Sequence, residues 1–342
     1  MTTQPQKKIY YLNASLLKKS SCDRLIQHIA LDGLKEPVNY NDTQYGSAFH
    51  KFISRMYESG GKFDEALVAA KAIMSLPCKI RNKKDHLNEQ HLVKTMFDFW
   101  EQYETSNNSF RLLINPTAIC YKCSGINGIP ICPSCDGKGV RPQPMVEQTF
   151  DIKVRETDDY EIHLAGTIDQ VGQIINGCFA VNDYKTTSTW DIESYLAPWR
   201  LSPQLKFYVS AIRRIGLANP DSEFARIAKT NVGACITGIF LKSSKETIFK
   251  RSDVFVFKES ELDEFDAMLE VKLDEFTKLI NDYRANRIIM PTGMMNDSCP
   301  GTSKWKCPYF NACNAPDSIA RNHVLKNNFK SVSYNPLQHD ND

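Results

Sequence analysis

Two aspartates and a lysine lie close together in the stretch 166–185, whose sequence is GTIDQVGQIINGCFAVNDYK. The Asn-Gly pair at 176–177 predicts a two-residue hairpin turn, because apolar runs flank it on both sides. Side chains alternate between the two faces of a strand, so Asp183 and Lys185 should point the same way. If the two strands pair, Asp169 on the first strand converges with them at one end of the sheet.

These three side chains suggest metal chemistry. Carboxylates are the hard oxygen ligands that Mg²⁺ or Mn²⁺ prefers, and a lysine beside such an ion offsets negative charge that develops on a phosphate. The same residues also fit an edge hairpin with ordinary surface charges. The hairpin alone leaves both interpretations open, and the rest of the chain has to decide between them.

The composition places the chain among globular proteins. Its 342 residues suffice for one large domain or two modest ones, and 42% of them are hydrophobic and 24% charged. No run of 18 apolar residues predicts a membrane span, and the N-terminus lacks the apolar core of a signal peptide, so we expect an intracellular, cytoplasmic protein. The net charge of +2 neither supports nor excludes a nucleic-acid partner.

Eleven cysteines without an export signal predict metal sites rather than disulfides. One group forms two C-x2-C knuckles separated by eight residues, which is the usual arrangement of a Zn²⁺ site, with a redox dithiol or iron as the alternatives. Such a site either staples an inserted loop or contacts DNA or a partner. Its members are Cys120, Cys123, Cys132 and Cys135.

A second group of cysteines lies near the C-terminus and contains only three thiols, so a scattered cysteine elsewhere in the chain would have to supply the fourth. Its members are Cys299, Cys307 and Cys313.

Two predicted helices carry polar pairs on one face. Segment 44–59 has helical periodicity, with Gly46 and His50 four residues apart, and the glycine permits close approach to the histidine. A satisfied core histidine is the plain alternative for His50. Ser202 as N-cap and Pro203 at the first position begin a second helix, and Gly216 is predicted to cap its end. Gln204 and Tyr208 share one face of this second helix.

The remaining elements are predicted from periodicity. Strands are expected at 8–12, 146–155, 232–241 and 253–257, and amphipathic helices at 62–76, 85–104 and 259–287. An aromatic loop precedes the Gln204 helix, and its rings either stack on unpaired bases or pack on one another. Its aromatic residues are Trp190, Tyr195 and Trp199. The polar tail, residues 324–342, is predicted to be disordered.

Taken in chain order, six motifs resemble those of a known family. They are Cys22 in an N-terminal helical segment, Gly46-x-x-x-His50, GTID with Asp169, DYKTT with Asp183 and Lys185, Gln204-x-x-x-Tyr208, and CPGTSKWKCPYFNAC at 299–313. This order resembles the RecB-like branch of the PD-(D/E)XK nuclease superfamily, over roughly residues 8–315. Within it, the chain looks most like the iron–sulfur nucleases, such as the AddB-type and CRISPR-associated exonucleases.

The resemblance implies a role for each motif. His50, Asp169 and Asp183 would bind a catalytic Mg²⁺ or Mn²⁺ ion, aided by the carbonyl after Asp183. Lys185 would position the water or stabilise the phosphate at the transition state. Gln204 and Tyr208 would orient Lys185 or hold DNA.

A second set of residues would bind an iron–sulfur cluster. Cys22, Cys299, Cys307 and Cys313 would ligate a [4Fe–4S] cluster that ties the two chain ends together. Three features depart from the family. The gap from Cys299 to Cys307 is longer than the family's, Asp23 follows the first cysteine where the family often has proline, and the knuckle at 118–140 is an insertion outside the common pattern.

We therefore expect an α/β, restriction-endonuclease-like fold, with a central mixed sheet flanked by helices. A single nuclease domain is predicted at 1–323, with a helical insertion at 60–105. The expected activity is that of a metal-dependent DNA exonuclease, acting on single strands or ends in phage or bacterial recombination, replication or repair. A catalytically silent DNA-binding or scaffold subunit is the alternative, and a zinc or redox protein with coincidental motifs is a third. Partner proteins from recombination or replication are compatible with each.

Overall fold

The computed structural model describes most of the chain, which forms two compact units assembled from separate stretches of sequence. The described residues are 7–37, 39–79, 89–105, 110–119, 140–174, 176–189, 191–241, 246–294, 299 and 307–337. Unit 1 comprises residues 1–39, 149–166 and 258–342, and unit 2 comprises residues 40–148 and 167–257. Strands β8 (Val146–Glu156) and β9 (Tyr160–Ile174) contribute residues to both units.

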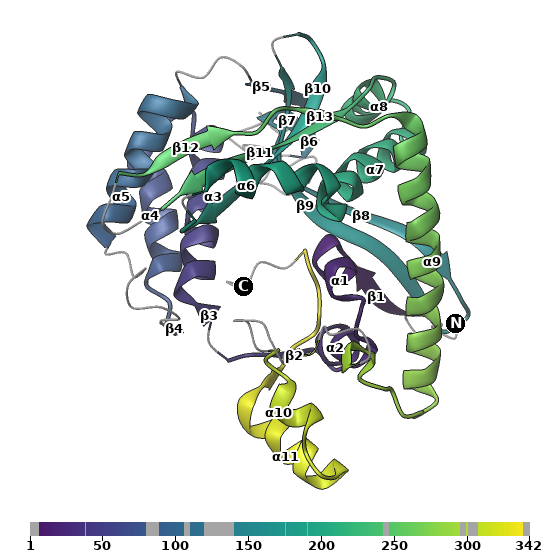
Figure 1. Ribbon diagram of the computed structural model, residues 1–342. Helices are drawn as coiled ribbons and strands as arrows, with labels where there is room; N and C mark the ends of the chain where they lie inside the picture. Colours follow the sequence, from purple (N-terminus) through teal and green to yellow (C-terminus); the bar gives the residue numbers. More distant parts are fainter. Residues whose placement is uncertain are drawn as a thin grey trace, which may run out of the picture. The chain divides into compact units, whose positions relative to one another are not determined.

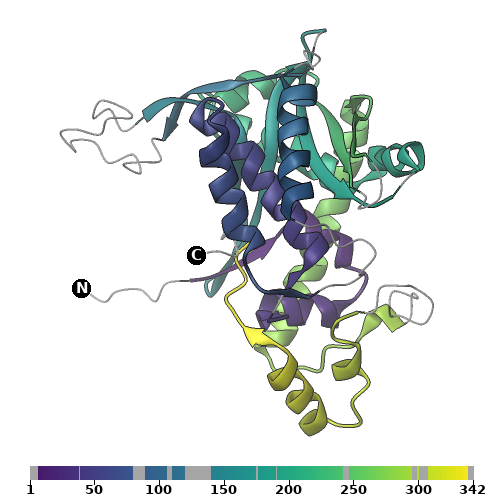
Figure 2. The same ribbon diagram turned by 90° about the vertical axis from the view of Figure 1, so that its left-hand side faces the viewer.

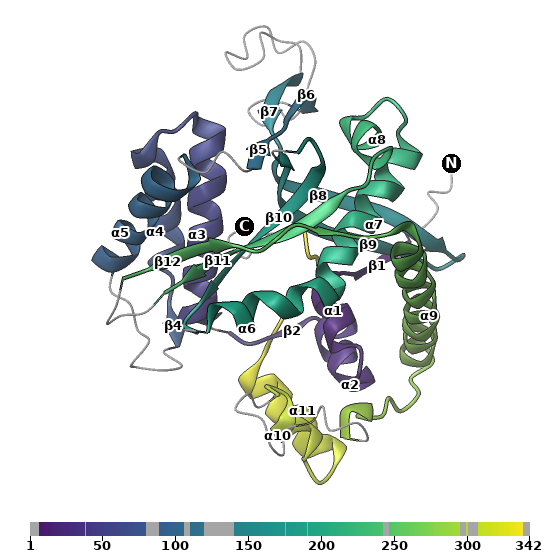
Figure 3. The same ribbon diagram turned by 45° about the horizontal axis from the view of Figure 1, so that its top comes forward.

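The sheet of unit 2 is mixed, and β10 (Phe179–Thr187) lies inside it (Figure 3). Strand β10 pairs antiparallel with the second half of β9, as the hairpin prediction required, and parallel with β11 (Gly233–Phe240). All residues of β11 are buried, which confirms the apolar strand expected there. Three short strands complete the sheet: β12 (Ile248–Arg251) and β13 (Phe255–Val256) pair with β11, and β5 (Phe110–Leu112) pairs with β9.

A parallel pair of strands needs a long crossover, and helices supply it between β10 and β11. These are α6 (Ile192–Leu196), the 3₁₀-helix η4 (Ala197–Leu201), α7 (Pro203–Ala218) and α8 (Glu223–Ala228). Ser202 caps α7 as predicted, since its hydroxyl accepts from the Gln204 N–H. Gly216 does not end the helix, contrary to expectation. A Cβ there would lie 2.8 Å from Ala228 Cβ, so the glycine allows α8 to pack closely.

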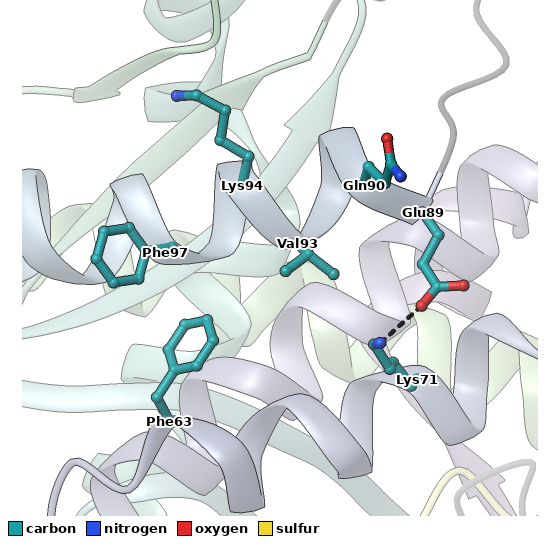
Figure 4. A pocket seen from close by; sticks show the side chains of 7 residues that line it. All are labelled: Phe63, Lys71, Glu89, Gln90, Val93, Lys94 and Phe97. Carbon is teal, nitrogen blue, oxygen red and sulfur yellow. Dashed lines mark ion pairs between the residues drawn. The ribbon is translucent and has the colours of Figure 1, made fainter.

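Residues 41–104 of unit 2 are mostly helical. Helices α3 (Asn41–Ser59), α4 (Phe63–Met74) and α5 (Glu89–Asp98) lie side by side, and α5 continues as the π-helix η3 (Phe99–Glu104) (Figure 1). The last three lie within the range 60–105, for which a helical insertion stays a prediction. The apolar face predicted for α3 is fully buried in one hydrophobic cluster, which includes Phe49, Phe52, Ile53 and Met56. Between α4 and α5 lies a surface pocket that is apolar at the Phe63 and Phe97 end and closed by the Lys71–Glu89 ion pair (Figure 4).

Two short pairs of strands complete unit 2. Strands β6 (Ile114–Ile119) and β7 (Val140–Pro144) pair antiparallel, and β3 (Asn39–Tyr40) pairs with β4 (Cys78–Lys79). The four cysteines predicted to bind zinc lie between β6 and β7, outside the described residues.

Unit 1 is built around the first half of β9, which pairs in parallel with β1 (Lys8–Leu12). The long helix α9 (Glu259–Arg284) buries the predicted apolar stripe, from Leu262 to Ile280. The N-terminal helices are α1 (Ala14–Lys19), α2 (Asp23–Ile26) and the π-helix η1 (Gln27–Leu31). Near the C-terminus follow the 3₁₀-helix η5 (Thr292–Met294), α10 (Phe310–Cys313) and α11 (Ser318–Asn328), and Figure 2 shows α10 and α11 side by side in yellow.

The expectation of a disordered tail fails for residues 324–337. Helix α11 runs through Asn328, and β14 (Lys330–Ser331) pairs antiparallel with β2 (Leu34–Lys35). The Phe329 ring stacks on Tyr309 with centroids 4.6 Å apart. The polar composition of the tail hid this docking, because backbone pairing and one aromatic contact anchor it. Residues 338–342 lie outside the described part of the chain.

Gly33 controls this docking, and its substitution gives a first test. Gly33 has φ +63°, and a Cβ on it would lie 1.8 Å from the carbonyl oxygen of Val332. The backbone N–H of Val332 donates to the Gly33 carbonyl oxygen at 2.7 Å. We expect Gly33→Ala to release the β14 segment and to expose it to trypsin. Gly60→Ala is the matched control, because Gly60 also has positive φ but no atom within 4 Å of its Cβ position. The control should cost only about 1 kcal/mol of backbone strain.

Limited proteolysis with mass spectrometry and thermal unfolding of both variants check this prediction. Equal effects of the two substitutions, with no new cleavage near β14, would show that the close contact to Val332 is unimportant.

None of the described helices has the length and apolar character needed to cross a membrane.

Candidate active site

Three side chains from distant parts of unit 2 come together at the hairpin of β9 and β10 (the catalytic hairpin). His50 lies on α3, Glu147 near the start of β8 and Asp169 on β9. The His50 Nδ1 atom lies 3.3 Å from Asp169 Oδ2 and 3.9 Å from Glu147 Oε1. One nitrogen and two carboxylate oxygens within 4.8 Å of one another form a donor set able to hold a metal ion. Two of the three predicted metal ligands therefore meet, together with a glutamate that was not predicted.

The backbone of Tyr184 holds this group in place. Its N–H donates to Asp169 Oδ2 at 2.7 Å, and its carbonyl lies 3.0 Å from His50 Nε2. Helix α3 can approach β10 because Gly46 has no side chain: a Cβ there would lie 3.1 Å from Thr186 Oγ1. The glycine thus permits a close approach of α3 to β10 at Thr186, and the role of His50 as a metal ligand stays a prediction.

Asp183 and Lys185 lie on the same face of β10, as their spacing predicted, and they form an ion pair. The Gln204 side-chain amide donates to Asp183 Oδ1 and to Tyr208 Oη, both at 2.9 Å. The Gln-x-x-x-Tyr pair on α7 therefore holds Asp183 directly, whereas the resemblance had suggested Lys185 or DNA. Oδ2 of Asp183 is the atom that faces the Lys185 ammonium, and the Asp183 side chain is only 2% exposed.

The two aspartates differ in their electrostatics. Burial favours the neutral form of each, but His50 and then Lys185 hold the pKa of Asp169 below its usual value. Burial, reinforced by Asp169, raises the pKa of Asp183 to about 6, although Lys185 opposes this. Lys185 remains charged, since Asp183 and Asp169 raise its pKa against the effect of burial. Carboxylates whose pKa values are pushed apart are typical of active sites.

His50 is a second positively charged group of the site, beside Lys185. Burial acts to lower its pKa, yet Asp169 and Glu147 outweigh burial and raise that pKa well above 6.5. The protonated imidazole thus sits between carboxylates where a metal ion would provide the positive charge. A divalent ion would compete with this proton, because a ligand imidazole must be neutral.

Glu147 is the site residue that sequence reasoning missed. It lies in the predicted strand 146–155, and nothing in its neighbourhood marks it as functional. Its backbone has φ +46°, which is unusual for a residue other than glycine and costs about 1–3 kcal/mol. Such strain gathers at functional sites, and here it accompanies a carboxylate placed beside His50.

Aromatic rings lie beside the lysine. The Lys185 ammonium lies over the Trp199 ring, 5.6 Å from its centroid, and Trp199 contacts Tyr195 edge-on. Tyr195 also packs against Phe240 of β11. These contacts favour the packed-loop interpretation for Tyr195 and leave base stacking by Trp199 as a proposal. Trp190 lies outside the described residues.

The four cysteines of the predicted cluster belong to unit 1, and two of them, Cys22 and Cys299, lie close together. A Cβ on Gly293 would lie 3.1 Å from Cys22 Sγ and 3.3 Å from Cys299 Sγ, so both thiols face one small space. Burial and then the thiols of Cys22 and Cys313 raise the pKa of Cys299. Burial also raises the pKa of Cys307, with contributions from the same thiols. The four thiols influence one another electrostatically, but among the described residues their sulfur atoms do not form a group of three within 4.8 Å of one another.

Cys313 differs from the other three. Burial acts to raise the pKa of its thiol, but hydrogen bonding to His28 and the charge of Arg24 lower it. The His28 ring is itself held by Asp32, whose Oδ2 lies 3.0 Å from Nδ1. A thiolate stabilised in this way fits a metal ligand.

Carboxylates, a histidine and a lysine, placed at a hairpin inside a mixed sheet, are consistent with the site of a metal-dependent phosphodiesterase. The profile of the PD-(D/E)XK nuclease superfamily matches residues 20–314, and the chain belongs to that superfamily. Membership implies a nuclease that uses a divalent metal and acts on DNA. The match does not distinguish branches of the superfamily, so the RecB-like iron–sulfur branch stays a prediction. No curated protein sequence matches the chain with significance.

Proposed function

We propose that this protein is a divalent-metal-dependent deoxyribonuclease, and that it acts as an exonuclease on single strands or DNA ends. The observation that carries the proposal is the convergence of His50, Glu147 and Asp169 beside the Asp183–Lys185 pair. Recombination, replication or repair in a bacterium or phage-infected cell is the proposed setting. The proposed location is the cytoplasm.

The donor set fits Mn²⁺ or Mg²⁺. Carboxylates of Asp169, Asp183 and Glu147, together with the His50 imidazole and the Tyr184 carbonyl, are the ligands on offer, and Mn²⁺ accepts such mixed sets readily. A bound divalent ion supplies Lewis acidity and lowers the pKa of a bound water. The protein's own part is to hold the carboxylates apart and to keep Lys185 charged.

Lys185 is proposed to stabilise the negative charge that builds on the phosphate when the phosphodiester is attacked. Its ammonium is fixed by Asp183 on one side and by the Trp199 ring on the other. Preorganised cations of this kind need no rearrangement as the reaction proceeds. The Gln204 amide donates hydrogen bonds to both Asp183 and Tyr208, and these bonds fix the orientation of the Asp183 carboxylate.

An assay on DNA labelled at either the 5′ or the 3′ end, single- or double-stranded, tests the proposal. We expect Mn²⁺- or Mg²⁺-dependent release of nucleotides, abolished by a chelator. The label that is released first gives the polarity. DNA binding without hydrolysis at any metal concentration would instead favour the catalytically silent scaffold alternative. Accumulation of internal fragments would replace exonuclease by endonuclease.

We further propose that Cys22, Cys299, Cys307 and Cys313 bind a [4Fe–4S] cluster. The close approach of Cys22 and Cys299, a glycine where a side chain would intrude, and a stabilised thiolate at Cys313 support this donor set. The cluster would supply a covalent tie between the first and last parts of unit 1, comparable to a clip that closes a long loop.

Purification without oxygen should give a brown protein with about four iron atoms per chain. Cys313→Ser should remove the colour and most of the iron and should lower the unfolding temperature. The matched control is Cys178→Ser, which changes a half-buried thiol of unit 2 and should keep both. Stoichiometric zinc without iron in the anaerobic protein, or full iron in Cys313→Ser, would contradict the cluster.

A further inference from the structure

A ring of five buried polar side chains lies behind the catalytic hairpin. Side chains alternate along strands, so Gln170 and Asn182 face away from the aspartates that adjoin them. Asn182 donates to Gln170 Oε1 at 3.0 Å and accepts from Thr237 Oγ1 at 2.8 Å. Arg251 Nε donates to Thr237 Oγ1 at 3.0 Å. Glu104 closes the ring, since Oε1 accepts from Gln170 at 3.3 Å and Oε2 lies 3.6 Å from Arg251 Nη2.

The ring spans four strands and one helix of unit 2. Gln170 pairs directly with Asn182 across β9 and β10, and Thr237 pairs with Arg251 across β11 and β12. Glu104 is the last residue of the π-helix η3, in the predicted helical insertion. Single-turn π-helices are frequent at functional sites, and this one delivers a carboxylate to the back of the sheet.

Fold stability is a poor explanation for this ring. Gln170, Asn182 and Thr237 are completely buried, and the Glu104 and Arg251 side chains are only 5% and 9% exposed. Taking an ion pair out of water costs several kcal/mol per charge, and apolar side chains of similar volume often give an equally stable core. Buried polar networks instead fix one arrangement of the groups they contact.

One group that the ring contacts is Tyr184, which lies between Asp183 and Lys185. The Tyr184 hydroxyl donates to Glu104 Oε1 at 2.9 Å. The backbone of the same residue carries the N–H that binds Asp169 and the carbonyl that faces His50. Its ring packs edge-on against Phe99 and His50. One residue therefore connects the buried ring to both metal-binding side chains.

We propose that Glu104 and Tyr184 are positioning residues of the metal site: the Glu104 carboxylate anchors the Tyr184 side chain and so fixes the peptide that orients Asp169 and His50. This inference rests on the proposed function of the site. Neither side chain contacts the metal position, and both act through the Tyr184 peptide of β10. The predicted helical insertion thereby becomes part of the active-site architecture through η3.

Tyr184→Phe tests the proposal because it removes one oxygen and keeps the ring packing. We expect the Mn²⁺ affinity to fall about tenfold, the loss typical of residues that orient metal ligands. Mn²⁺ binding is measured directly on the full chain, by calorimetry or by the electron spin resonance of free Mn²⁺. In nuclease assays the Mn²⁺ requirement should rise by the same factor, while kcat at saturating Mn²⁺ should stay near that of the wild type.

Tyr57→Phe is the matched control. The Tyr57 hydroxyl donates to the same Glu104 oxygen, but Tyr57 lies on α3 and its backbone touches no predicted ligand. Both substitutions remove one hydrogen bond to one carboxylate, so they should lower thermal stability similarly. Only Tyr184→Phe should weaken Mn²⁺ binding. Unchanged Mn²⁺ affinity in Tyr184→Phe, or an equal loss in both variants, overturns the proposal.

Two further variants separate this inference from the proposed function. Asp169→Asn should abolish Mn²⁺ binding. If the wild type binds no Mn²⁺, or Asp169→Asn binds it normally, then the metal site itself is wrong and both proposals fall.

Glu104→Gln provides a second test should Tyr184→Phe fold poorly. It replaces a charge-assisted hydrogen bond by a neutral one of about half the strength, so a several-fold loss of Mn²⁺ affinity is expected, and wild-type affinity would count against the proposal.

Discussion

Lys185→Ala should lower the rate of DNA hydrolysis about a thousandfold. The ammonium is the one cation of the site that stays charged when a divalent ion displaces the proton of His50, since Asp183 and Asp169 raise its pKa. Removing a single preorganised group that stabilises transition-state charge typically costs 10²- to 10³-fold in rate. The loss should appear in kcat rather than in KM, because the interaction strengthens as charge develops on the phosphate.

Single-turnover hydrolysis of end-labelled DNA at saturating Mn²⁺ measures this effect. Lys94→Ala is the matched control, because Lys94 also pairs with an aspartate, Asp98, but lies on α5. The control should keep the wild-type rate. Lys185→Arg should recover only part of the activity, since a guanidinium is larger and distributes its charge differently. Hydrolysis by Lys185→Ala at the wild-type rate would remove Lys185 from the catalytic site.

The sequence predicted the catalytic hairpin because its signals are local. The Asn-Gly turn at 176–177 sets the register, which pairs Asn182 with Gln170 and so places Asp183 beside Asp169. Alternation along one strand then puts Lys185 on the same face as Asp183. The Gln204–Tyr208 pair was equally accessible, because helical spacing and the Ser202 cap fix that face without any distant contact.

The sequence could not predict the groups that approach from far along the chain. Glu147 reaches the site through a positive φ, and the conformation of one residue depends on the packing around it rather than on its own preference. Glu104 looks like an ordinary acidic residue at a helix end. Only the folded chain shows that its Oε1 atom accepts hydrogen bonds from tyrosine hydroxyl groups on α3 and β10. In both cases an unremarkable surface residue type is made functional by non-local packing.

The C-terminal segment shows the opposite error. Low hydrophobicity after residue 324 predicted disorder, because such a composition offers little apolar area to offset the lost chain entropy. The segment nevertheless docks through Phe329 on Tyr309 and through backbone pairing with β2. Backbone hydrogen bonds cannot be predicted from amino-acid composition. Gly33, whose positive φ the docking requires, is a residue from which the docking could have been predicted.

Mn²⁺ binding should strengthen steeply as the pH rises, and His50 is the reason. The neighbouring carboxylates raise its pKa well above 6.5, although burial opposes this. Below that raised pKa the imidazole carries a proton that a metal ion must displace, so each pH unit should change the apparent affinity up to tenfold. Below about pH 6 protonation of Asp183 adds a second displaced proton.

The stability of the metal-free protein should change in the opposite sense. A histidine whose pKa is raised by folding contributes stability that is complete below about pH 6.5, the unfolded value, and is lost as the pH rises through the folded value. The raised pKa of Asp183 acts in the same direction, and its contribution is lost as the pH rises through about 6. The metal-free chain should therefore be less stable at pH 8.5 than at pH 6, and Mn²⁺ should restore most of the difference.

Calorimetric titrations in two buffers of different ionisation enthalpy measure the number of protons that Mn²⁺ releases. We expect about one proton per Mn²⁺ near pH 7 and a rising number below pH 6. In His50→Gln the release near pH 7 should vanish, because no imidazole proton remains to be displaced. His163→Gln, which changes a histidine held by Asp151 and Glu161 in unit 1, is the control and should release protons as the wild type does. An Mn²⁺ affinity that stays constant from pH 6 to 8.5 would exclude His50 as a ligand. A protonated imidazole must lose its proton before it can bind a metal ion, so binding to His50 has to depend on pH.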